Sequence, residues 1–255
     1  MSKAGEVRAA TVGGDPRTKW SRVLGNVKAI VYLMTRTFIS DKSFLIQFFM
    51  FPVLAAVMTH FVASADEYMP DTMFVSMFSA MFAGMILITV TAGIIAGEKE
   101  NKSMRLLIMS GVKPVQFLIG VTLSLMALSF VSVLAFAVQL GGTAGELAVF
   151  MLMMMLGVLC SIMLGATIGL IANSVQSSTA IAVPVAIVLA FSPMLANFND
   201  TIRSIFQFFY TMQVSETIDN LSANPTEALL IVAVNAVVLM GVFLAAYHRK
   251  GLKGL

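Results

Sequence analysis

Residues 147–171 read LAVFMLMMMLGVLCSIMLGATIGLI and contain no charged side chain. A helix needs about 20 apolar residues to cross the hydrocarbon core of a bilayer, so this stretch by itself predicts a membrane span. Five further apolar segments of similar length follow the same rule: Phe44–Ala63, Thr72–Ala96, Pro114–Leu140, Thr179–Asn197 and Glu227–Tyr247. Together the segments predict an all-α integral membrane protein with six transmembrane helices in residues 44–247.

The composition of the whole chain supports this fold class. Of 255 residues, 58% are hydrophobic and 11% are charged, and the mean hydropathy is +0.92. A soluble domain carries about 25% charged residues and a disordered chain is more polar still, so both classes are excluded. The single cysteine, Cys160, excludes a disulfide framework, and two distant histidines do not suggest a metal site. The net charge of +3 is small, and we expect no nucleic-acid partner.

Lysine and arginine are distributed unevenly among the connecting segments. Eight precede the first span, four lie in residues 97–113, three lie in the tail 248–255, and only Arg203 lies in the other set of connections. Cytoplasmic connections of membrane proteins are enriched in these residues. We therefore expect a protein of the plasma membrane with both termini in the cytoplasm, which six spans allow.

An amphipathic segment, residues 20–43, precedes the first span and follows a polar N-terminus, residues 1–19. Its apolar residues recur at helical spacing: Trp20, Val23, Leu24, Val27, Val31, Met34 and Phe38. The opposite side carries Arg22, Asn26, Ala29, Tyr32 and Arg36. This profile predicts a helix that lies in the cytoplasmic interface of the bilayer.

The connection between the fifth and sixth spans, residues 198–226, is predicted to be an extracellular loop. It contains a cluster of large apolar side chains: Ile205, Phe206, Phe208, Phe209 and Tyr210. Because such side chains favour the bilayer surface, we expect the cluster to contact lipid.

The cytoplasmic loop 97–113 lies within the sequence AGEKENKSMRLLIMSGVKPVQFLIG, residues 96–120. Charges of both signs at its start are followed by an apolar run, and then by Gly111 and Pro114. A short helix with one charged and one apolar side is suited to docking into a groove of a cytoplasmic partner. A solvated connector would explain the same residues, and the pattern does not choose between the two. The chain contains no GxxxxGK[ST] phosphate loop, so we expect no ATPase activity in it.

This loop resembles that of type-two ATP-binding-cassette transporter permeases, in Glu98-Lys99-Glu100, Arg105-Leu106-Leu107 and residues 110–114. Residues 170–174, 177–178 and 191–193 resemble the fourth and fifth spans of that family. The resemblance implies six spans, a connecting helix in residues 20–43 and an ATPase-coupling helix from Glu98 to Ser110. It also implies a complex of two permeases, identical or related, with two cytoplasmic ATPase subunits that bind ATP and Mg²⁺. Such complexes, many of them bacterial, export drugs, peptides or lipid-like molecules.

Ionisable side chains are nearly absent from the predicted spans. His60 with Thr59, and Gln139, are candidates for a substrate pathway, although an interfacial histidine and a helix–helix hydrogen bond are the simpler explanations. An ATP-independent transporter or channel is the alternative function, but such proteins commonly need intramembrane charges. An intramembrane enzyme would need a catalytic pair or HExxH motif within the spans, and none is present.

Overall fold

The computed structural model describes residues 16–62, 70, 72–101, 109, 112–196, 198–220 and 225–251. Six helical segments in these residues are long and apolar enough to cross a membrane, which confirms the six predicted spans. They are α2 (Lys42–Phe61), the combined segment α3 (Thr72–Met81), η2 (Phe82–Ile86) and α4 (Leu87–Glu100), then α6 (Pro114–Leu140), α7 (Ala144–Ile171), α8 (Val175–Ala196) and α11 (Thr226–Ala246). A short π-helical segment, η3 (Tyr247–Gly251), continues α11.

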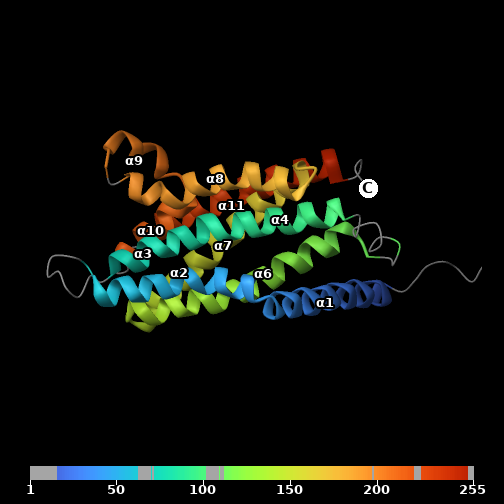
Figure 1. Ribbon diagram of the computed structural model, residues 1–255, viewed down its shortest axis with the longest axis horizontal. Helices are drawn as coiled ribbons and strands as arrows, with labels where there is room; N and C mark the ends of the chain where they lie inside the picture. Colours follow the sequence, from blue (N-terminus) through green and yellow to red (C-terminus); the bar gives the residue numbers. More distant parts are fainter. Residues whose placement is uncertain are drawn as a thin grey trace, which may run out of the picture.

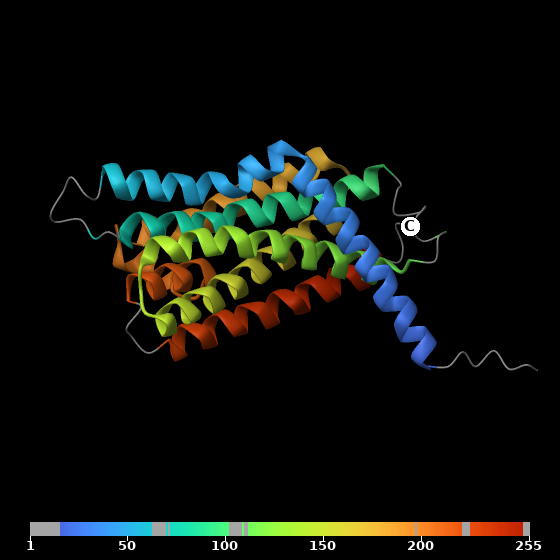
Figure 2. The ribbon, with the colours of Figure 1, turned by 90° about the horizontal axis from the view of Figure 1, so that it is seen from below.

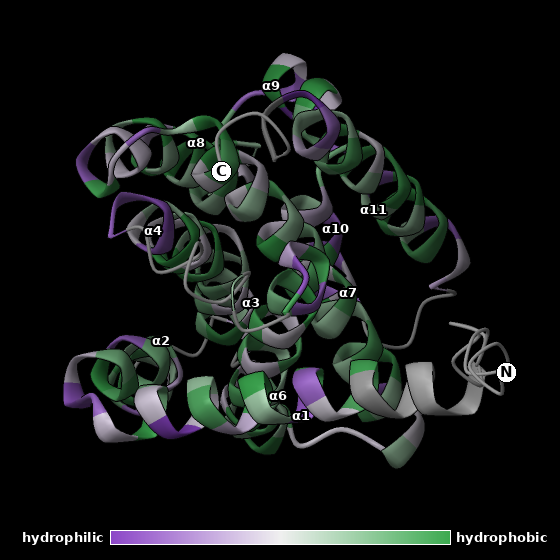
Figure 3. Cartoon of the chain, turned by 90° about the vertical axis from the view of Figure 1, so that its right-hand side faces the viewer, coloured by the Kyte–Doolittle hydropathy of each residue, from purple (hydrophilic) through white to green (hydrophobic). Residues whose placement is uncertain are grey.

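The six segments run side by side along the long axis of the molecule (Figure 1). One end of the bundle carries α1 (Pro16–Ser40) and η3, and is called the α1 end below (Figure 1). The opposite end carries α9 (Asp200–Phe206) and is called the α9 end. Figure 3 looks at the bundle from the α1 end, where hydrophobic colouring covers the outward side of α11. Only Val232 of α11 is buried, as expected for a helix at the lipid-facing edge of a bundle.

Several helix starts are set by local capping. Asp41 accepts a hydrogen bond from the backbone N–H of Ser43 at 2.9 Å and caps α2, so the amphipathic helix ends at Ser40 rather than at the predicted residue 43. Thr143 and Glu146 form a capping box that starts α7 at Ala144, three residues before the predicted Leu147. Pro114 occupies the first turn of α6, where its missing N–H leaves no bond unmade.

Helix α1 crosses α6 obliquely (Figure 2). Ile30 is buried against α6 at Gly120, where an added Cβ would lie 2.5 Å from the Ile30 side chain. Asn26 donates to the side-chain oxygen of Gln116 at 3.2 Å, so Asn26 faces the bundle and not the polar side predicted for it. Leu24 is 65% exposed. The rest of the predicted apolar stripe does lie on the packed side: Phe38 is buried, and Val23, Val27, Val31 and Met34 are partly buried.

Helix α7 passes through the centre of the bundle, and glycines let its neighbours approach closely. A Cβ at Gly165 would lie 2.5 Å from the carbonyl oxygen of Ile88 in α4. One at Gly169 would lie 2.8 Å from the carbonyl oxygen of Ala92. In lipid, helices associate mainly through such close packing, because the surrounding chains are as apolar as the side chains.

The second span is not a continuous α-helix. Its middle turn, η2, brings Gly84 against the backbone of α8. A Cβ added at Gly84 would lie 2.9 Å from the backbone nitrogen of Ala190. Ser161 of α7 donates to the carbonyl oxygen of Ala83 in the same turn. The Tyr210 hydroxyl lies 2.7 Å from the Ser161 oxygen. Because Ser161 already donates its one proton to Ala83, Tyr210 is the donor of this second hydrogen bond. A π-turn thus joins α7 and α8 to the second span.

The predicted extracellular loop contains two helices, α9 and α10 (Tyr210–Asp219). Ile205 and Phe208 are exposed, as expected for contact with lipid, but Tyr210 is 2% exposed. The predicted lipid contact is wrong for Tyr210. A buried tyrosine hydroxyl needs a hydrogen-bond partner, and Ser161 of α7 is that partner within the bundle.

The α4–α7 contact predicts opposite effects for two glycine substitutions. Gly165→Ala should destabilise the protein by about 1–3 kcal/mol, because the added methyl group would clash with the backbone of Ile88. The apparent melting temperature in detergent should fall accordingly. Gly93→Ala in α4 is the matched control, since nothing lies within 4 Å of its added Cβ. The control should be neutral or stabilising. Equal melting temperatures for the two variants would contradict the contact.

Candidate functional site

The last turn of α4 is joined to the end of α7 by Lys99. The Lys99 ammonium group donates to the carbonyl oxygens of Leu170 and Ala172, at 2.8 and 2.6 Å. The last carbonyls of a helix have no partner within the helix, and a cation there also interacts favourably with the helix dipole. Lys99 therefore caps α7 from a different helix.

Glu100 makes the complementary bond at the start of α8. Its carboxylate accepts a hydrogen bond from the backbone N–H of Val175 at 2.8 Å, where the helix dipole favours a negative charge. Gly97, one turn earlier, lies close to the Val175 side chain. We call the set Lys99, Glu100, Leu170, Ala172 and Val175 the α4 clamp. It joins the residues that begin the predicted coupling segment to both α7 and α8.

The α4 clamp changes the interpretation of the predicted coupling residues. Glu98, Lys99 and Glu100 belong to α4, which continues through Gly97 and ends at Glu100. Glu100, one of the residues of the predicted coupling helix, is bonded within the chain. Residues 102–108 and 110 lie outside the described residues, and with them Arg105, Leu106 and Leu107. Trp20 lies in α1, but its side chain is also outside the description.

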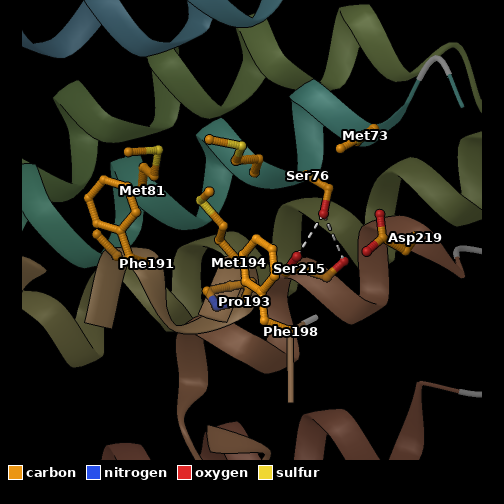
Figure 4. A pocket seen from close by; sticks show the side chains of 11 residues that line it. Met73, Ser76, Met81, Phe191, Pro193, Met194, Phe198, Ser215 and Asp219 are labelled. Carbon is orange, nitrogen blue, oxygen red and sulfur yellow. Dashed lines mark hydrogen bonds between the residues drawn. The ribbon is translucent and has the colours of Figure 1, made fainter. Parts of the chain in front are cut away.

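A cavity of about 240 Å³ opens near the α9 end of the bundle. Its walls come from α3, from the last turns of α8 with Phe198, and from α10. Methionines and aromatic side chains make up most of the lining, and Ser76, Ser215 and Asp219 add polar groups (Figure 4). None of these polar residues was singled out from the sequence, because Ser215 and Asp219 lie in a segment predicted to be a loop.

The three residues predicted to form a substrate pathway do not line this cavity. Gln139 donates to the carbonyl oxygens of Pro52 and Ala135, at 3.1 and 2.9 Å, so it joins α6 to α2. The Thr59 hydroxyl is buried with no hydrogen-bond partner in the part of the chain that the structure describes. His60 is exposed and lies edge-on to Phe61.

Six helical segments long and apolar enough to cross a membrane, packed in part through glycine contacts and through the capping of α7 by Lys99, define an all-α integral membrane protein. The family model described as ABC-2 family transporter protein matches residues 58–247, so the chain belongs to this family. It is a membrane component of ATP-binding-cassette transport, a permease subunit, and this membership disfavours the ATP-independent alternative. Comparison with curated proteins finds no match.

The α4 clamp predicts a specific loss of stability. Lys99→Met removes two charge-assisted hydrogen bonds and leaves the end of α7 uncapped, so it should destabilise the purified protein by about 1–2 kcal/mol. The control is Lys28→Met, which removes an exposed cation from α1. Thermal unfolding in detergent would measure both. If Lys99→Met melted like Lys28→Met, the clamp would contribute nothing to the fold.

Proposed function

We propose that this chain is the permease of an ATP-driven exporter, in which two permeases work with two separate ATPase subunits that bind ATP and Mg²⁺. The substrate is a hydrophobic or amphipathic molecule. The observation that carries the proposal is the α4 clamp, considered together with family membership. A segment that follows α4 directly can act on three helices at once, because α4, α7 and α8 are bonded to one another at that end.

The coupling step follows from this arrangement. Residues 98–110, docked on an ATPase subunit, move with it when ATP binds, and α4 moves with them. Lys99 and Glu100 then transmit the displacement to the end of α7 and the start of α8. Leu106 and Leu107 supply an apolar anchor for the docked segment, and Arg105 and Glu98 supply charges that fix its orientation.

The orientation of the chain supports the same function. Fifteen of the sixteen lysines and arginines fall in residues 1–42, 97–113 and 248–255. The described parts of these stretches include α1, the last turn of α4, the start of α6 and η3, which lie toward the α1 end (Figure 1). We therefore place the α1 end in the cytoplasm, where the ATPase subunits are available, and both termini with it. The α9 end and its cavity then face the outside of a bacterial plasma membrane.

The proposed assembly can be measured directly. The full chain, tagged and purified from its native membranes in mild detergent, should retain a partner that contains a GxxxxGK[ST] motif. Native mass spectrometry should give a mass for two permeases and two ATPases. Recovery of an oligomer of this chain alone, with no ATP hydrolysis in the preparation, would refute the proposed function.

The proposed orientation makes a separate prediction. Single cysteines replace Asp71, Lys102 or Ser222 in a Cys160→Ala background, and intact cells are treated with a thiol reagent that does not cross membranes. Positions 71 and 222 should react, whereas position 102 should react only after the cells are opened. Labelling at position 102 in intact cells would reverse the orientation.

A further inference from the structure

The cavity at the α9 end is polar at one end and apolar at the other. Figure 4 shows Ser76, Ser215 and Asp219 gathered together, with Met81 and Phe191 at the opposite end. The Ser76 hydroxyl lies 2.7 Å from that of Ser215 and 3.2 Å from the Ser215 carbonyl oxygen. Asp219, the last residue of α10, is exposed, so the polar end of the cavity is open to solvent.

Asp219 has no cationic partner within 4.0 Å among the described residues. The nearby arginine, Arg203, is paired with Glu216 at 3.0 Å, the only salt bridge in the described part of the chain. Desolvation raises the pKa of Asp219, a hydrogen bond from Ser76 lowers it, and the charge of Glu216 raises it again. The side chain is nevertheless accessible from solvent. A cation placed beside this carboxylate would offset both the desolvation and the repulsion by Glu216.

The deeper part of the cavity suits an apolar group of variable shape. Met77, Met81 and Met194 line the cavity with flexible, polarizable side chains, whereas Met73 stands beside the polar end (Figure 4). Phe191 and Phe198 add aromatic rings, which attract a cation over their faces and pack against apolar groups. Below the cavity, the backbone contact of Gly84 with Ala190 limits how far a ligand can enter.

We infer that this cavity binds small amphipathic organic cations, with the cationic group beside Asp219 and the apolar body among the methionines. The inference rests on the proposed transport function, for which it names the substrate class. The hydroxyls of Ser76 and Ser215 can accept or donate hydrogen bonds at the polar end, but they carry no charge. The carboxylate of Asp219 therefore determines which sign of ligand charge the cavity prefers.

The test compares two ligands of similar size and opposite charge. The full chain is purified in neutral detergent, and binding of benzyltrimethylammonium and of benzylsulfonate is measured by titration calorimetry. The cation should bind and the anion should not. Asp219→Asn should weaken binding of the cation by about tenfold or more, while Asp200→Asn, which removes an exposed carboxylate of α9, should leave it unchanged.

A second variant tests the apolar part of the site. Met194→Trp fills the cavity and should abolish binding of the cation, with the melting temperature of each variant confirming that it folds. Equal weakening by Asp200→Asn and Asp219→Asn would show only a diffuse attraction to the acidic surface and would overturn the inference. Binding of the anion as tight as that of the cation would also overturn it, as would no binding of the cation.

This experiment separates the inference from the proposed function. Binding to the permease needs neither ATP nor an ATPase subunit. A two-plus-two complex that hydrolyses ATP but ignores Asp219 would leave the proposed function intact and remove the cation site. If the chain bound the cation through Asp219 but recruited no ATPase, the cation site would stand and the proposed function would be refuted.

Discussion

The close backbone contact between α4 and α7 is the constraint on which the rest of this structure depends. In lipid there is little hydrophobic gain from joining two apolar helices, so their association relies on packing and on hydrogen bonds between them. Gly165 and Gly169 let α7 reach the backbone of α4, and at that separation Lys99 reaches the last carbonyls of α7. The glycines and the lysine thus act along one interface.

Some polar side chains within the bundle donate to backbone carbonyls of neighbouring helices. Pro52 lacks an N–H, which leaves the carbonyl of Phe48 without its helical donor, and Ser132 of α6 donates to that carbonyl at 3.2 Å. Ser161 does the same for Ala83 in the π-turn. Without water in the hydrocarbon core, each freed carbonyl needs such a partner, so these residues have structural roles and are not part of a polar pathway.

The α4 clamp and the cavity lie at opposite ends of the same helices. The second span begins at the cavity with Met73 and ends at the clamp with Lys99. Helix α8 begins at the clamp with Val175 and ends at the cavity with Met194. The π-turn and Gly84 join these two helices midway between the sites. A displacement of α4 and α8 at one end therefore has a direct structural route to the cavity walls at the other.

The sequence by itself determined the six spans, because a helix in lipid satisfies its backbone locally and length with apolarity suffices to locate it. It also located the amphipathic helix before them, but it placed Glu98, Lys99 and Glu100 in the connection after the second span and not in α4. Only the tertiary structure decided what those charges contact, since Lys99 and Glu100 bond to residues more than seventy positions away. The same holds for Tyr210 and Asp219, whose segment reads as a loop but forms α10 against the bundle. Their roles depend on neighbours that helix packing brings together, and sequence periodicity carries no information about that packing.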